Sequence, residues 1–275
     1  MTARTEAIRL PAVPNDAPLP RSRYPLSFDV GFLSVSFHGK ITLKDVAAAI
    51  PDRQVLAVIG PSGAGKSTFL RVLNRTLEII PQARVVRGEV HFKGENLYGR
   101  GVDARIVRKR IGMVHQKPLA FPLSIRENVL FGVRFHQHWQ GRPKDEFTQT
   151  YLERAGLWEE VKDRLRQPAS ALSVGQLQRL CIARALANEP EALLMDEPCS
   201  ALDPVSTARI EELILGLKEQ LPVIIVTHNL AQARRIADRC LFLADGVCLE
   251  QGPADRIFTD PASARVRDFV TGKIG

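Results

Sequence analysis

The chain has 275 residues, of which 45% are hydrophobic and 25% are charged, as is usual for one large globular domain with room for a subdomain. No apolar run approaches the roughly 20 residues that span a bilayer, and the N-terminus lacks the apolar core of a signal peptide. The net charge of +8 is scattered, and its short cluster at residues 105–110 is interpreted as a solvated helix face, so it does not predict nucleic-acid binding.

The first part of the sequence predicts a leader followed by β structure. Five prolines and little apolar periodicity in residues 1–26 predict a flexible or extended leader before a domain over residues 27–275. Residues 27–50 alternate as strands do and predict an antiparallel β region. Residues 54–59 predict a buried strand, and residues 68–75 predict a helix.

A glycine-rich loop joins that strand to that helix. It reads Gly-Pro-Ser-Gly-Ala-Gly-Lys-Ser-Thr and fits the phosphate-binding pattern G-x-x-x-x-G-K-[ST]. The backbone N–H groups of such a loop point at an anion, its lysine reaches the β- and γ-phosphates, and its first hydroxyl reaches Mg²⁺. We therefore predict nucleotide binding by Gly60, Pro61, Ser62, Gly63, Ala64, Gly65, Lys66, Ser67 and Thr68.

The rest of the chain alternates strands with helices, which predicts an α/β fold with a parallel sheet. A helical insertion is expected over about residues 117–188, where the prolines and the periodicity change the character of the sequence. Further strands are predicted over residues 85–92, 111–114, 192–195 and 223–226, and helices over residues 143–157 and 174–188. The cysteines show no C-x-x-C spacing and are expected to be reduced thiols in a cytosolic setting: Cys181, Cys199, Cys240 and Cys248.

Two further motifs carry chemistry. Asp196 and Glu197 follow an apolar strand, at the strand end where ligands of parallel sheets bind. An aspartate there can hold Mg²⁺, and the adjacent glutamate can take a proton from an attacking water. Ser173 is a natural N-cap, and Gly175 leaves the first turn of its helix open to an anion.

With these motifs in place, the chain resembles the ATPase subunits of ABC transporters over roughly residues 27–272. The resemblance implies a P-loop NTPase (RecA-like) core with an antiparallel β subdomain and an inserted helical subdomain. The motifs occur in the family's order, namely the phosphate loop, Gln116, the signature at residues 173–176, Asp196 with Glu197, the loop at residues 200–203, and His228.

The resemblance implies ATP and Mg²⁺ as cofactors and a role for each matching residue. Ser67, Gln116 and Asp196 would arrange Mg²⁺, and Glu197 would be the general base. The catalytic set would be completed by Gln116 and by His228, which would contact the γ-phosphate. ATP bound to a second chain would be contacted by the signature and by a coupling aspartate: Ser173, Gly175, Gln176 and Asp203.

The adenine base would stack on an aromatic ring before the phosphate loop. Phe37 is the first choice and His38 the alternative, although Phe37 also suits a buried strand position. Two substitutions depart from the usual signature, Val174 in place of glycine and Leu177 in place of glutamine. His115 stands where phenylalanine is usual, either as a source of pH sensitivity or as a passive substitution.

The implied partners are a second ATPase chain paired head to tail, two transmembrane permease subunits, and indirectly a periplasmic or extracellular substrate-binding protein. The chain would lie peripherally on the cytoplasmic face of the cell (inner) membrane, where residues 117–139 would receive the permease. No nucleic-acid partner is expected.

The sequence is most similar to the ATPases of bacterial phosphate-specific importers (PstB), which implies inorganic phosphate as the cargo. That similarity rests on residues 112–118, 121–125, 180–184, 196–204 and 271–275. Phosphonate, amino acids or another solute stay open as cargo. Two other functional classes are less favoured alternatives. A soluble ABC ATPase acting on DNA or ribosomes usually carries a long coiled coil or a second cassette, neither of which is seen in this sequence. A P-loop kinase would lack the signature.

Overall fold

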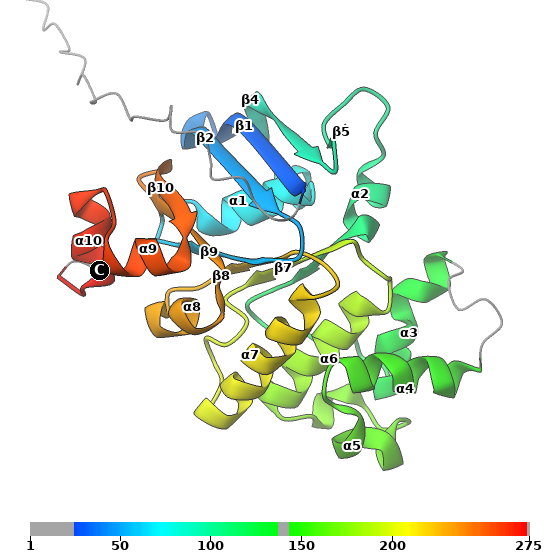
Figure 1. The fold of residues 1–275 in the computed structure, drawn as a ribbon. Helices are drawn as coiled ribbons and strands as arrows, with labels where there is room; N and C mark the ends of the chain where they lie inside the picture. Colours follow the sequence, from blue (N-terminus) through cyan, green and yellow to red (C-terminus); the bar gives the residue numbers. More distant parts are fainter. Residues whose placement is uncertain (1–24, 137–142, 274–275) are drawn as a thin grey trace, which may run out of the picture.

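The computed structural model describes residues 25–136 and 143–273. The predicted leader lies outside the described residues except for its last two positions. In the described part, a four-stranded and a six-stranded sheet lie one above the other, with helices below and beside them (Figure 1). This arrangement confirms the predicted α/β fold of the P-loop type.

The upper sheet is antiparallel and has the order β2-β1-β4-β5. The predicted β region over residues 27–50 is the hairpin of its first two strands. The sheet consists of β1 (Leu26–Phe37), β2 (Lys40–Pro51), β4 (Ala83–Phe92) and β5 (Glu95–Asn96).

The lower sheet has the order β10-β9-β3-β8-β7-β6 and is parallel except for the edge strand β10. All four interior strands are buried along their length and apolar except for Arg239 of β9 and Asp196 of β7, as expected of strands covered on both faces. The sheet consists of β3 (Val55–Ile59), β6 (Ile111–Val114), β7 (Ala192–Asp196), β8 (Val223–Val226), β9 (Arg239–Ala244) and β10 (Val247–Pro253).

The helices follow the strands in the chain order expected of crossover connections. They are α1 (Lys66–Leu73), α2 (Ala104–Arg110), α3 (Ile125–His136), α4 (Lys144–Arg154), α5 (Trp158–Val161), α6 (Val174–Leu186), α7 (Pro204–Lys218), α8 (Leu230–Ile236), α9 (Ala254–Thr259) and α10 (Ala264–Val270). None of the described helices is both long and apolar enough to cross a lipid bilayer.

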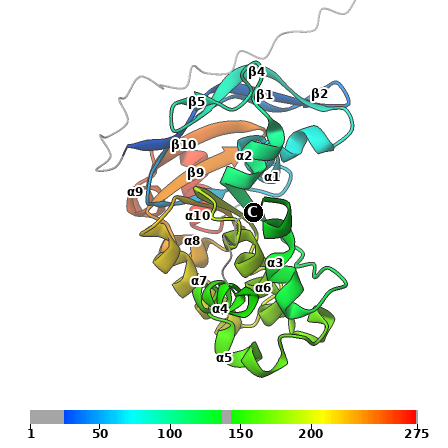
Figure 2. The ribbon, with the colours of Figure 1, turned by 90° about the vertical axis from the view of Figure 1, so that its right-hand side faces the viewer.

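Alternation along the strands divides the buried side chains into two cores. On β3, Val55, Ala57 and Ile59 face the core shared with α3, α4 and α6 to α8, whereas Leu56 and Val58 face α1 and the antiparallel sheet. Figures 1 and 2 show α1 between the two sheets and α6 to α8 on the opposite side of the lower sheet. Both faces of the parallel sheet are therefore shielded from solvent.

The predicted helix boundaries were shifted by a few residues. The helix expected over residues 68–75 begins at Lys66, because the last residues of the phosphate loop form its first turn. The helix expected over residues 174–188 ends at Leu186, where the side chain of Asn188 donates to the carbonyl of Arg184. Residues 117–188 contain α3 to α6 and, in their described part, no strand of either sheet. A separate helical subdomain remains a prediction.

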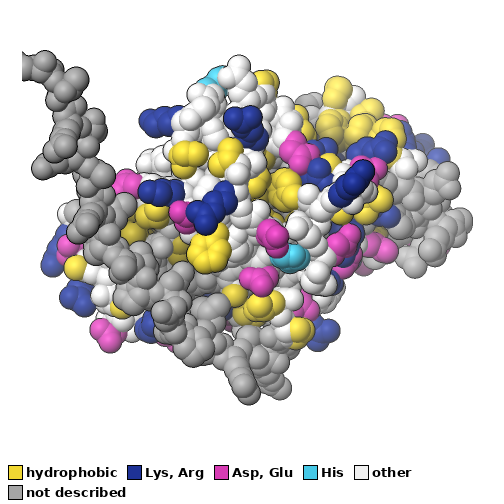
Figure 3. All heavy atoms as spheres, turned by 90° about the horizontal axis from the view of Figure 1, so that it is seen from above, with side chains coloured by type: hydrophobic (Ala, Val, Ile, Leu, Met, Phe, Trp, Pro, Cys, Tyr) yellow, Lys and Arg dark blue, Asp and Glu magenta, His cyan; other side chains and the backbone are white. Residues whose placement is uncertain are grey.

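The basic cluster at residues 105–110 lies within α2, where Arg105 is exposed while Arg110 is partly buried and pairs with Glu95 and Glu191. Basic and acidic side chains are interspersed on the face seen from above (Figure 3). The four cysteines lie in the described part of the chain and are free thiols.

Candidate active site

The carboxyl ends of four neighbouring parallel strands bring the predicted residues together. The order β3-β8-β7-β6 places these ends along one edge of the sheet. From β3 the chain enters the phosphate loop, and from β8 it enters the turn that carries His228. Gln116 follows β6, and Asp196 with Glu197 ends β7. This edge is where parallel sheets bind ligands.

The phosphate loop fits closely against the sheet. A Cβ atom on Gly60 would lie 1.9 Å from the carbonyl oxygen of Leu243, and Gly60 has a φ of 141°, so no other residue fits there. Lys66 is 7% exposed, and its Nζ donates to the carbonyls of Gly60 (2.7 Å) and Pro61 (2.9 Å). Burial lowers the pKa of Lys66, while the nearby carboxylates of Glu197 and Asp196 raise it. A buried ammonium group is therefore held at the mouth of the loop.

Ser67 and Asp196 meet across the sheet edge. The hydroxyl of Ser67 donates to Oδ1 of Asp196 over 2.9 Å. Burial raises the pKa of Asp196, and the hydrogen bond from Ser67 opposes that rise. A hydroxyl and a buried carboxylate side by side are the oxygen ligands that Mg²⁺ takes when it is also bound to phosphates.

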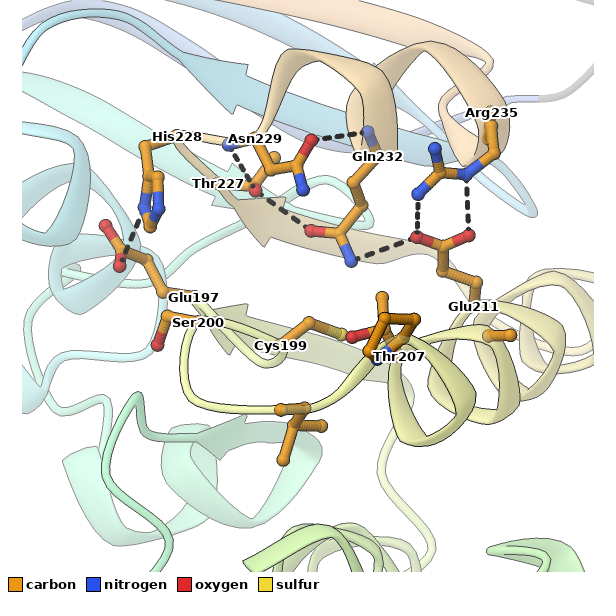
Figure 4. A pocket seen from close by; sticks show the side chains of 13 residues that line it. Glu197, Cys199, Ser200, Thr207, Glu211, Thr227, His228, Asn229, Gln232 and Arg235 are labelled. Atoms are coloured by element: carbon orange, nitrogen blue, oxygen red, sulfur yellow. Dashed lines mark hydrogen bonds and ion pairs between the residues drawn. The ribbon is translucent and has the colours of Figure 1, made fainter.

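Glu197 is the point where the three predicted catalytic residues converge. Its backbone is in the left-handed region with a φ of 47°, and its N–H donates to the carbonyl of Val226 over 2.9 Å. Its Oε2 accepts a hydrogen bond from Nε2 of Gln116 (2.8 Å) and lies 3.1 Å from Nδ1 of His228. Figure 4 shows the imidazole and the carboxylate facing each other at one end of a cavity of about 580 Å³.

These residues fit a magnesium–nucleotide ligand. The first N–H groups of α1 have no acceptor inside the helix, and its N-cap, Gly65, supplies no side-chain cap. The loop thus offers N–H donors and one ammonium group to phosphates, and Ser67 with Asp196 offers oxygen atoms to Mg²⁺.

The signature residues lie at the start of α6, and within the described part of the chain they form no hydrogen bond with the phosphate loop. Ser173 and Gln176 form a capping box, in which Ser173 Oγ accepts from the N–H of Gln176 and Gln176 Oε1 accepts from the N–H of Ser173. Val174 is 50% exposed, so its added side chain points away from the core. The signature of one chain is thus left free to face another molecule.

The signature helix is packed against the loop that carries Asp203. Asp203 caps α7 by accepting from the N–H groups of Val205 and Ser206, both over 2.9 Å. A Cβ atom on Gly175 would lie only 2.7 Å from Oγ of Ser206. Gly175 therefore allows the N-termini of α6 and α7 to lie against each other.

The adenine position stays a prediction. Phe37 ends β1, is half-buried and packs against the core beneath the antiparallel sheet, as its alternative structural role requires. His38 is exposed in the following turn with a φ of 47°. The hairpin does lie beside the phosphate loop, because a Cβ atom on Gly65 would meet the side chain of Leu43 at 2.5 Å.

His115 has a lowered pKa, chiefly because its ring loses solvent and secondly because the positive charge of Arg71 is near. A lowered pKa disfavours the charged ring, and both interpretations of this substitution stay predictions.

Glu160 was missed by the sequence analysis. It lies on α5, and its carboxylate accepts from Arg179 (2.7 and 3.0 Å), from the signature residue Gln176 (2.8 Å) and from Arg209 of α7 (2.8 Å). One side chain therefore joins three helices behind the signature. No local pattern marks it, because each partner comes from a different part of the chain.

Replacing Glu160 with alanine is expected to lower the free energy of unfolding by about 3 kcal/mol, since it leaves the guanidinium of Arg179 buried without its counter-ion. The Arg179 side chain is only 4% exposed. Urea denaturation would measure the loss. The matched control is Glu159→Ala, whose side chain is 77% exposed and, among the residues that the structure describes, forms an ion pair with Lys162 only. A control that costs as much as the test variant would contradict this role.

The ion pair between Glu160 and Arg179 also predicts how the free energy of unfolding depends on pH. The hydrogen bond from Arg179 is the largest cause that lowers the pKa of Glu160 below its ordinary value of 4.5. A carboxylate with a lowered pKa in the folded state stabilises the protein at neutral pH, and that contribution is lost as the pH falls below 4.5. The difference in free energy of unfolding between the wild type and Glu160→Gln should therefore shrink as the pH falls through 4.5 towards the lowered pKa of Glu160.

Comparisons with known proteins agree with this geometry. The family described as "ABC transporter" matches residues 43–200, more than half of the chain. The structure of cbiO1 from Clostridium perfringens, described as part of the ABC transporter complex cbiONQ, is 27% identical with a TM-score of 0.73. The match covers 86% of this chain and 91% of that one.

A bacterial Atm1-family ABC exporter with ATP bound shares the fold. It is 22% identical with a TM-score of 0.75, and the match covers 96% of this chain and 44% of the exporter chain. The phosphate loop, Gln116, the signature and the two carboxylates all lie inside the family match. On these grounds the chain belongs to the ABC transporter family, as an ATP-binding ATPase component.

Proposed function

We propose that this chain hydrolyses ATP at the edge of its parallel sheet, facing the signature of a second copy, and thereby energises solute import. The observation that carries the proposal is the convergence of Gln116 and His228 on one oxygen of Glu197, at 2.8 and 3.1 Å. A carboxylate held in this way is placed to accept a proton from water.

Each residue of the site has a role in this proposal. Lys66 and the N–H groups of residues 63–68 bind the phosphates, and Ser67, Asp196 and Gln116 hold Mg²⁺. The bound metal neutralises charge on the phosphates. Glu197 orients and deprotonates the water, and His228 holds the carboxylate and the γ-phosphate in register. Phe37 or His38 stacks on adenine.

A head-to-tail pair completes the site. Ser173 caps α6, and Gly175 and Gln176 lie in its first turn, where the N–H groups that the capping box leaves over suit an anion brought by a second chain. Asp203 lies against that N-terminus through Ser206 and couples the two sites. The dimer is tested by trapping the protein with ATP under conditions that block hydrolysis, and a protein that stays monomeric there contradicts it.

Two transmembrane permease subunits are the proposed partners of this chain, which would lie peripherally on the cytoplasmic face of the cell (inner) membrane. Leu119 and Phe135 are 62% and 72% exposed. The ring of Phe131 lies 4.2 Å from that of Phe121 in a tilted contact and 5.4 Å from that of Phe135 in an edge-to-face contact, and this aromatic cluster suits an apolar partner. The predicted surface at residues 117–139 includes residues 137–139, which lie outside the described residues.

Inorganic phosphate, delivered by a substrate-binding protein, is the cargo we propose, on the sequence similarity to phosphate-specific importers. Phosphonate and amino acids are the alternatives. The test is uptake of labelled phosphate by cells in which this chain is the sole ATPase of its kind, with Glu197→Gln as the inactive control. Uptake of labelled phosphate should collapse in the variant. In cells with the wild-type chain, only unlabelled phosphate should compete with the labelled phosphate. Normal uptake in the variant contradicts the assignment, and competition by phosphonate or amino acids reassigns the cargo.

A further inference from the structure

His228 is held mainly through its backbone. Its side chain is 61% exposed, and among the described residues its recorded partner is Glu197 alone. An exposed imidazole with one partner is not fixed by packing. The position of its ring therefore depends on the turn formed by Thr227, His228 and Asn229, which leaves β8 and enters α8.

Buried hydrogen bonds close that turn on both sides of the histidine. Thr227 is 3% exposed, and its Oγ1 accepts from the N–H of Asn229 over 3.0 Å. The same hydroxyl donates to Oε1 of Gln232 over 2.9 Å. The side chain of Asn229 accepts from the N–H of Gln232 over 3.0 Å and so caps α8.

Glu211 of α7 sets the direction of these bonds. Gln232 is 1% exposed, and its Nε2 points at Oε1 of Glu211 over 3.4 Å. A carboxylate only accepts, so the amide group of Gln232 must present its nitrogen to Glu211 and its oxygen to Thr227. Arg235 donates two hydrogen bonds of 2.6 and 2.9 Å to Glu211 and so orients its carboxylate.

Figure 4 shows this chain of groups along one wall of the cavity whose far end is Glu197 and His228. It runs from Arg235 and Glu211 through Gln232 to Thr227 and Asn229. We propose that Glu211, Gln232 and Thr227 are positioning residues that fix the backbone of His228 and thereby its contact with Glu197. The proposal rests on the proposed function, because it assigns how the catalytic histidine is held.

The decisive variant is Thr227→Val, which keeps the shape of the side chain and removes its hydroxyl. Its matched control is Thr227→Ser, which keeps the hydroxyl. Misplacing a catalytic group by a fraction of an ångström is costly, so Thr227→Val should lower kcat for ATP by about tenfold, with KM unchanged. Thr227→Ser should stay within about twofold of the wild type.

The same variants are then made in a His228→Ala background. If Thr227 acts through His228, adding Thr227→Val to His228→Ala should change kcat by less than about twofold, because the two effects are coupled. Release of labelled phosphate from ATP measures the low rates, and thermal unfolding checks the fold.

Each result decides the proposal. A tenfold loss that recurs in the His228→Ala background shows a general structural role and overturns it, as does full activity of Thr227→Val. If Thr227→Val does not fold, Gln232→Met, which keeps length and removes both hydrogen-bonding ends, carries the same comparison. Unchanged turnover in His228→Ala alone contradicts the proposed catalytic role of the histidine, which is a separate failure.

Discussion

Replacing Glu197 with glutamine is expected to lower ATP turnover by about 100- to 1000-fold, the range usual for removing a general base. Glutamine keeps the size of the side chain and can still accept hydrogen bonds from Gln116, which donates to Glu197 over 2.8 Å. The amide cannot take a proton from water. Nucleotide binding should therefore survive, and the variant should accumulate as an ATP-trapped dimer.

Steady-state phosphate release and equilibrium nucleotide binding measure these two effects separately. The matched control is Glu212→Gln on α7, an exposed glutamate that undergoes the same chemical change away from the sheet edge. A Glu197→Gln protein that turns over ATP at a rate near that of the wild type would show that another group takes the proton.

Replacing Lys66 with methionine is expected to weaken ATP binding by about 100-fold, which corresponds to losing one or two charge-assisted hydrogen bonds. Methionine preserves the buried aliphatic stem but removes the ammonium that now donates to the carbonyls of Gly60 and Pro61. Burial disfavours the charged form of Lys66, as the lowered pKa shows, so the fold should tolerate this change.

Thermal unfolding with and without Mg²⁺ and ATP separates binding from folding. The midpoint without nucleotide should stay close to that of the wild type, while the rise caused by nucleotide should be lost, because a ligand stabilises only the state that it binds. Lys109→Met on α2 is the control and should keep the rise. A normal rise in Lys66→Met would contradict the role of this lysine.

Local patterns were sufficient for the motifs and for most elements. The phosphate loop carries its own glycines and lysine, and the buried strands appear as unbroken apolar runs such as Val223–Val226. Capping chemistry also acts locally, so Ser173 marked the start of α6 from the sequence. The exact ends of helices were less certain, because propensity changes little over one turn and tertiary packing decides them.

The order of strands in space was not contained in any local pattern. Along the chain the strands run β3, β6, β7, β8, but across the sheet they run β3, β8, β7, β6. That rearrangement pairs Ser67 with Asp196 across 129 positions and Gln116 with Glu197 across 81. Motif order suggested that these residues share a site, and only the sheet decided which atoms meet.

The residues that support the site depended wholly on the tertiary structure. Glu160 accepts hydrogen bonds from arginines of α6 and α7, and Gln232 is hydrogen-bonded to both Glu211 and Thr227. Neither belongs to a motif, because a glutamate or glutamine on a helix is ordinary until its partners are known. The sequence by itself determined the family and predicted the nucleotide site. The packing of α5 to α8 decided how the signature and His228 are held, since buried charges and amides acquire partners only when distant segments come together.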